Sequence, residues 1–175
     1  MFAFPPAGRL ITVVVAVGAY CLGFVGNAAA EPGTQDDLNT LMGELPQGYS
    51  SANCTEEPIP ADSPLRALVT VTCGQANVPN GPTGAVFALY RNPADADAQL
   101  RDAGPIDLAT CPNSGPSPTT WQRNSAPGQI AGLIECGTDS NNKAALLWTD
   151  HPKLLGGFVA GSDIPTLYQW WNDYA

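Results

Sequence analysis

Apolar residues recur along the chain at the spacings of helices and strands. After the first thirty residues they are spaced three and four positions apart, at Leu38, Leu41, Met42 and Leu45. This spacing places them on one face of a helix. Thr34 is a candidate N-cap for this helix, and Pro46 ends it. We therefore predict a helix over residues 34–45, followed by a loop rich in Pro, Ser and Glu over residues 46–64.

Shorter segments rich in β-branched and apolar residues predict strands. They are residues 66–73, 84–90, 119–123, 129–136, 143–149 and 154–160. The segment 84–90, GAVFALY, is apolar on both faces and therefore predicts a central strand that is covered on each side. Residues 105–119 are rich in proline and predict a loop.

A second helix is expected after the second of these strands, and a third at the C-terminal end. Asn92 is a candidate N-cap, Pro93 suits the first helical position, and Gly104 ends the segment. Hairpin-linked strands with helices between and after them are typical of an α+β domain. We predict a single α+β domain, with an antiparallel sheet that helices cover on one face.

The last predicted helix, over residues 163–173, contains a candidate ligand contact. Its apolar face is formed by Ile164, Leu167, Tyr168 and Trp171. Trp170 lies one position off this face, so we expect it to be more exposed than Trp171. An aromatic side chain at the surface can contact a ligand, which makes Trp170 a candidate binding residue. Packing against the sheet is the alternative.

The first 30 residues have the pattern of a targeting segment. Arg9 precedes an apolar run of 16 residues, and Ala28 and Ala30 supply the small residues that a signal peptidase requires. We expect cleavage after Ala30, which leaves an extracytoplasmic domain of residues 31–175. A retained membrane anchor is the alternative, but the apolar run is shorter than the ~20 residues that a membrane span needs.

The charge of the chain is mainly negative. Sixteen Asp and Glu face seven Lys and Arg, a net charge of −9, and removal of Arg9 with the signal peptide makes it −10. The electrostatic field of this negative charge repels phosphate groups, so we expect neither a nucleic-acid partner nor electrostatic attachment to anionic lipid. Otherwise the acidity favours solubility.

Four cysteines remain after the signal peptide, and an even number in an exported chain predicts disulfides. Three pairings are open. Each half of the chain runs cysteine, loop, strand, Cys-Gly, turn and apolar strand, which suggests a duplicated hairpin unit. We therefore predict Cys54–Cys73 and Cys111–Cys136. No CxxC pair is present, and we expect no metal and no cofactor.

Candidate catalytic residues are few. His151 is the only histidine and could act as a general base. It lies in the turn-like stretch Thr-Asp-His-Pro, and no serine stands in a Gly-x-Ser-x-Gly setting. The acidic pairs are Asp36-Asp37, Glu56-Glu57 and Asp95/Asp97. Two of these pairs suit the N-termini of helices, and the third lies in a predicted loop. We predict no catalytic residue and keep His151, expected in an exposed turn, as a second candidate binding residue.

Residues 50–171 also resemble a known group of proteins. The sequence GAVFALYRNPADADAQL is followed by GLIECGTDSNNKAALLWTD and a closing LYQWW. This succession is similar to that of secreted actinobacterial domains of unknown function, common in mycobacteria, and to extracytoplasmic regions of some Ser/Thr protein kinases. No kinase signature is present, so no enzymatic residue is carried over. The resemblance implies a location in the cell envelope or outside the cell, and a sensing or binding role.

Two functional hypotheses follow. The first is an exported, non-catalytic binding or interaction module of the cell envelope, whose ligand is unknown. The alternative is a small secreted hydrolase with a site assembled from distant residues around His151. A partly apolar pocket without a paired base and nucleophile would favour the first, and His151 bonded to a carboxylate beside a cleft would favour the second.

Overall fold

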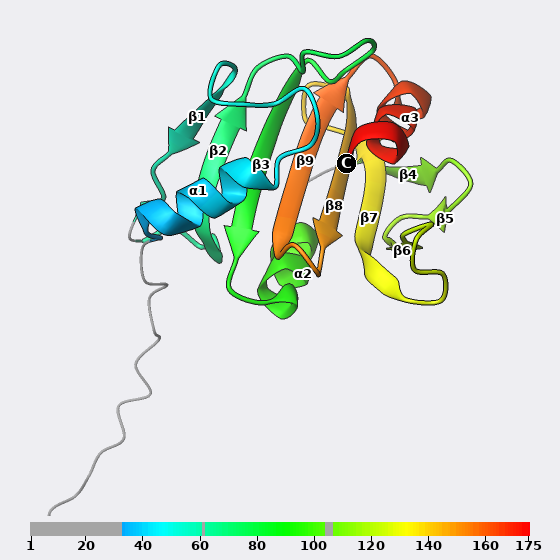
Figure 1. The fold of residues 1–175 in the computed structure, drawn as a ribbon. Helices are drawn as coiled ribbons and strands as arrows, with labels where there is room; N and C mark the ends of the chain where they lie inside the picture. Colours follow the sequence, from blue (N-terminus) through cyan, green and yellow to red (C-terminus); the bar gives the residue numbers. More distant parts are fainter. Residues whose placement is uncertain (1–32, 61, 104–106) are drawn as a thin grey trace, which may run out of the picture.

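The fold is an antiparallel sheet with three helices packed against it (Figure 1). The computed structural model describes residues 33–60, 62–103 and 107–175. The predicted signal peptide, residues 1–30, lies outside these residues. The strands are β1 (Cys54–Glu57), β2 (Ala67–Cys73), β3 (Gly84–Tyr90), β4 (Asp107–Cys111), β5 (Gly115–Pro116), β6 (Thr119–Gln122), β7 (Ile130–Thr138), β8 (Ala144–Asp150) and β9 (Leu155–Gly161). The helices are α1 (Gln35–Gly43), α2 (Pro93–Asp102) and α3 (Ile164–Tyr174).

The strands follow the order β1-β2-β3-β9-β8-β7-β4-β5, and β6 also pairs with β7. All the pairings among the described residues are antiparallel. The α+β class, the antiparallel sheet and all six predicted strands are therefore confirmed. The last strand, β9, lies between β3 and β8 and so joins the two halves of the chain at the centre of the sheet.

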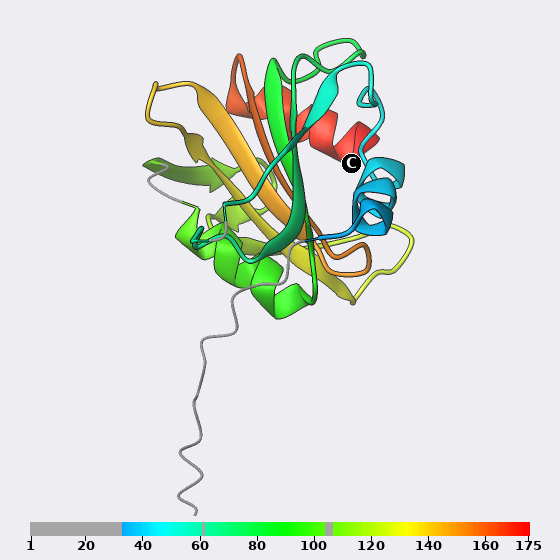
Figure 2. The same cartoon turned by 90° about the vertical axis from the view of Figure 1, so that its left-hand side faces the viewer.

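Helices cover both faces of the sheet, whereas the sequence analysis placed them on one face. α1 and α3 lie on one face, and α2 packs on the other (Figure 2). The reason lies in β3, which is apolar on both sides. Phe87 points into the core beneath α1 and α3, while Ala88 and Tyr90 pack with Ala96 of α2. A strand of this kind needs cover on each face.

Both disulfides are present in the predicted pairing, Cys54–Cys73 and Cys111–Cys136. The first joins β1 to β2, and the second joins β4 to β7. In each half a short outer strand is thus linked to its neighbour, the arrangement that the suggested hairpin unit requires. The sequence analysis interpreted these outer strands as parts of loops. β1 and β4 are mostly exposed, so they lack the apolar alternation by which strands are recognised.

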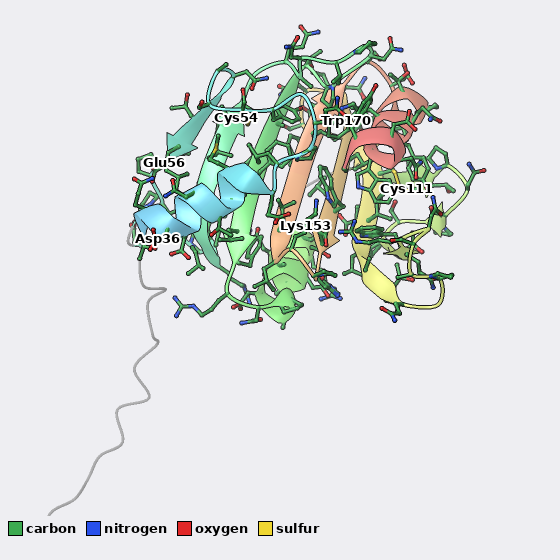
Figure 3. All side chains as sticks on the ribbon, viewed as in Figure 1. Asp36, Cys54, Glu56, Cys111, Lys153 and Trp170 are labelled. Carbon is green, nitrogen blue, oxygen red and sulfur yellow. A yellow bond between two sulfur atoms is a disulfide. The ribbon has the colours of Figure 1, made fainter. Side chains whose placement is uncertain are left out.

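The prediction for the C-terminal helix was wrong in one respect: Trp170 is 2% exposed and Trp171 is 7% exposed. Trp170 lies under α3 against the sheet, with its ring 6.0 Å from Tyr49 and 6.2 Å from Trp148 (Figure 3). Trp171 packs edge-on against Trp121, with 5.0 Å between the rings. Because aromatic residues flank α3 on two sides, its buried face is wide enough to hold both tryptophans.

No helix in the described parts of the chain is long and apolar enough to cross a membrane. The two disulfides are typical of proteins in oxidising compartments.

Candidate functional site

A groove of about 330 Å³ lies between α2 and the face of the sheet that this helix covers. Its floor is formed by β2, β3, β9 and β8, and its wall by α2. Most of the lining is apolar. Residues that define it are Ala88, Leu100, Leu147 and Phe158, together with Ala67 and Ala96.

The groove is hollow because small residues face it. Ala96 of α2 and Ala103, directly after α2, face the groove, and Ala88 of β3 lies opposite Gly156 of β9. A Cβ atom at Gly156 would lie 2.8 Å from the ring of Tyr90, so only glycine lets this ring rest against β9. With a larger side chain at these positions, α2 and the sheet would fill the space between them, as in an ordinary core.

Apolar side chains at the rim of the groove are open to solvent. Val86 on β3 is 39% exposed and Leu65, just before β2, is 36% exposed. The chain beside Leu65 is attached to α2, because the Arg66 N–H donates to the Gln99 side chain at 3.1 Å. Arg66 also forms an ion pair with Asp102 at 3.1 Å. The rim is thus held in place while its apolar atoms remain accessible.

Two threonine hydroxyls on the floor of the groove are already bonded within the protein. The Thr70 hydroxyl donates to the backbone carbonyl of Glu57 at 2.8 Å. The Thr149 hydroxyl donates to Asp97 at 2.8 Å. Burial raises the pKa of Tyr90, which also lines the groove, to about 12, so its hydroxyl is neutral at ordinary pH. The floor therefore presents an uncharged surface.

His151 lies in the predicted turn, directly after β8, but it is bonded to α2, a contact that the sequence analysis did not predict. Its Nε2 is 2.9 Å from Oδ1 of Asp97, a residue 54 positions earlier in the chain. The same Oδ1 accepts the hydrogen bond from Thr149, whose oxygen accepts the Leu133 N–H at 2.9 Å. The His151 side chain is 25% exposed and that of Asp97 is 19% exposed. His151 is therefore half-buried, and its hydrogen bond attaches α2 to the end of β8.

This arrangement supplies only part of a catalytic site. Among the described residues, Asp97 is the one hydrogen-bond partner of the His151 ring. The Thr149 hydroxyl, which shares Asp97 with His151, donates to that carboxylate, and the four cysteines of the described residues are bridged. The residues that line the groove do not include His151. The hydrogen bond between His151 and Asp97 thus attaches α2 to the turn after β8.

An ion pair lies next to the His151–Asp97 hydrogen bond. The Asp150 side chain, 3% exposed, pairs with Arg123, whose guanidinium lies 5.3 Å from the centre of the Trp121 ring. The Trp121 indole N–H donates to the Thr149 carbonyl at 2.8 Å. These contacts fix the end of β8, and with it the position of His151.

Trp170, the other candidate binding residue, is too deeply buried to contact a ligand at the surface. Its indole nitrogen, that of Trp171 and the Tyr49 hydroxyl have no hydrogen-bond partner among the described residues. All three belong to the core under α1 and α3. The candidate binding role of Trp170 is therefore replaced by a role in packing.

A wider depression of about 860 Å³ lies among loops at the other end of β2, lined by residues 48–50, 52–53 and 75–79. The Asn53 side chain bridges these loops by donating to the carbonyls of Gly48 and Gln75, both at 2.9 Å. This depression is more open and more polar than the groove. The groove is the better candidate because small-molecule sites are concave and mostly apolar.

In the parts of the chain that the structure describes, no three His, Cys, Asp or Glu side chains come together as a metal site. Comparisons with protein-family models, with curated proteins and with solved structures found no match to this chain. Its function is therefore inferred from the geometry of the groove.

Proposed function

We propose that this protein is an exported, non-catalytic binding module of the cell envelope, and that its groove takes the apolar part of a small ligand. The observation that carries the proposal is the apolar hollow between α2 and the sheet, with Val86 and Leu65 exposed at its rim. Its volume of about 330 Å³ falls at the lower end of the ~300–1,000 Å³ range of small-molecule sites.

The physical argument is that apolar surface in the groove gains free energy when a ligand removes it from water, by roughly 25 cal/mol for each Å² buried. Monomeric proteins usually fill such hollows with their own side chains. Here the small residues Ala88, Ala96 and Gly156 leave the space open. The open space is therefore a feature of the sequence that packing alone does not require.

The groove is also held in shape before any ligand binds. The Cys54–Cys73 disulfide fixes β1 beside β2, and Asp97 fastens α2 to Thr149 and His151. A preorganised site loses less conformational freedom on binding. An extracytoplasmic location is consistent with the disulfides, with the predicted signal peptide and with the location that the resemblance implies.

The alternative, a hydrolase around His151, is favoured by one observation, the 2.9 Å contact between His151 and Asp97. A carboxylate can orient an imidazole in this way, but a nucleophile on its other nitrogen is also needed. The native protein is expected to be inactive on a panel of ester, peptide, glycoside and phosphate substrates. Turnover that disappears in His151→Ala would establish the hydrolase instead.

The binding proposal is tested by titrating the purified protein with a neutral, apolar fluorescent probe such as N-phenylnaphthylamine. The native protein should bind the probe with enhanced fluorescence. Val86→Asp places a charge at the rim and should weaken binding by about tenfold or more, because a charge in an apolar site costs more than ~1.4 kcal/mol. Ile130→Asp makes the same change at a residue that is 56% exposed outside the groove, and should bind like the native protein.

Two results would contradict the proposal. One is a native protein that does not enhance the fluorescence of the probe. The other is an equal loss of binding in Val86→Asp and Ile130→Asp, which would show that the probe binds to no particular apolar site.

A further inference from the structure

A carboxylate stands at the edge of the groove, on β1. In a strand, successive side chains point to opposite faces of the sheet. The side chain of Cys54 lies in the core under α1, and Glu56 shares that face (Figure 3). Glu57 therefore points to the face of α2. Glu57 lies opposite Thr70, and both residues line the groove.

Glu57 is the one charged residue among the described residues that line the groove. Arg66, next to the lining residue Leu65, is already paired with Asp102 at 3.1 Å. Glu57 makes no ion pair with any described residue. The uncompensated charge at the groove is therefore negative.

The net charge of the whole chain has the same sign. At −9 it opposes the approach of an anionic ligand and favours that of a cation. The local carboxylate and the overall field thus select the same kind of ligand, while the apolar floor requires that the ligand also carry an apolar body.

We propose that the groove binds a cationic amphiphile, a monomeric molecule with an apolar chain or ring that lies between α2 and the sheet and an amine or quaternary ammonium group that lies beside Glu57. This inference rests on the proposed function, because it specifies the ligand class of the same groove. Glu57 acts as the residue that selects the head group, and the small residues of the floor receive the apolar body.

The expected selectivity is modest, because Glu57 is exposed. Two unit charges about 4 Å apart in water attract each other enough to change an affinity roughly fivefold. Salt screens this attraction, and at about 1 M ionic strength the screening length falls to ~3 Å. The preference for a cation should therefore disappear at high salt, whereas the contribution of the apolar body should remain.

Three molecules with one chain and different head groups test the inference: octylammonium, octanol and octanoate. Each is used to displace the neutral fluorescent probe from the purified protein at low ionic strength. Octylammonium should displace the probe at about one fifth of the octanol concentration. Octanoate should be the weakest of the three.

Two variants separate the groove from the general charge of the protein. Glu57→Gln should bring octylammonium and octanol to nearly equal affinities. Glu56→Gln removes the same charge from the adjacent residue on the opposite face, and should preserve the preference. Far-ultraviolet circular dichroism of both variants checks that they remain folded.

The failures of the two proposals are distinguishable. If the native protein binds the three molecules equally, or if Glu56→Gln and Glu57→Gln reduce the preference equally, the selection by Glu57 is wrong and the apolar groove stands. If none of the three displaces a probe that does bind, the cationic amphiphile is the wrong ligand class and the apolar groove stands. If the probe itself does not bind, both the groove function and this inference are wrong.

Discussion

The two faces of the sheet are built from the same strands and differ in what covers them. Under α1 and α3 the space is filled by large aromatic side chains, among them Phe87, Trp148 and Trp170. On the opposite face, which α2 covers (Figure 2), half of the residues that line the space are alanine, glycine or threonine, and a groove of about 330 Å³ remains. The first face supplies most of the buried apolar core, and the second offers a ligand a place to bind.

The largest effect is expected on the filled face. Trp170→Ala should lower the free energy of unfolding by ~3–5 kcal/mol, the range for emptying a large aromatic site. Trp171→Ala should cost less, because Trp171 is more exposed and packs at the margin of the core. Chemical denaturation of both variants measures the difference. A larger loss in Trp171→Ala would show that the centre of this core has been placed wrongly.

On the groove face, Asp97→Ala removes the carboxylate to which both Thr149 and His151 are hydrogen-bonded. We expect a loss of ~1–3 kcal/mol in unfolding free energy, because the buried Thr149 hydroxyl loses its acceptor. Since α2 forms the wall of the groove, probe binding should weaken as well. If the variant loses stability but binds the probe as the native protein does, the hydrogen bonds of Asp97 do not determine the shape of the groove.

The small residues of the groove floor can be enlarged one at a time. In Gly156→Ala the added Cβ lies 2.8 Å from the ring of Tyr90, so the ring must move into the groove or α2 must shift. A loss of ~1–3 kcal/mol in unfolding free energy is expected, together with weaker probe binding. Gly74→Ala is the control, since its nearest non-neighbouring atom is 3.9 Å away. Identical behaviour of the two variants would contradict the close packing at Gly156.

The smallest effect concerns pH. Glu135 on β7 is 7% exposed, and burial raises the pKa of its carboxyl above the ordinary 4.5, with Arg101 partly opposing the shift. A raised pKa in the folded state means that stability is full below the ordinary value and falls as pH rises through the raised value. Glu135→Gln should therefore reduce the loss of stability as the pH rises above 4.5, relative to native protein.

The control for this measurement is Glu56→Gln, a change at an exposed carboxylate on β1. Denaturation curves at several pH values compare the three proteins. If Glu135→Gln shows the same pH dependence as the native protein, Glu135 is not the group responsible.

Local signals in the sequence predicted the elements well. Thr34 caps α1 by accepting the Asp37 N–H at 3.2 Å, and Asn92 caps α2 by accepting the Asp95 N–H at 3.0 Å. Such caps involve residues three positions apart, so a sequence pattern contains both partners. The disulfide pairing was predictable for a related reason, since each bridge joins positions within one half of the chain.

The site could not be predicted in this way, because its parts meet only in the folded chain. Asp97 and His151 are 54 positions apart, and no pattern connects them. The groove exists because α2 packs on the face of the sheet opposite α1 and α3. Since β3 is apolar on both faces, its sequence is compatible with a helix on either face. The alanines of α2 and the pair Gly156-Gly157 are visible in the sequence. They indicate a groove only once the fold shows that they face one another across the space between α2 and the sheet.

The most direct test of the account is to map the amide chemical shifts of the protein during titration with octylammonium. The account predicts that shifts cluster on residues of the groove, in β2, β3, β9 and α2, and that Glu57→Gln raises the octylammonium concentration needed to produce them roughly fivefold. Shifts that cluster instead on the loops at residues 48–53 and 75–79, or that occur nowhere, would contradict the assignment of the groove as the binding site.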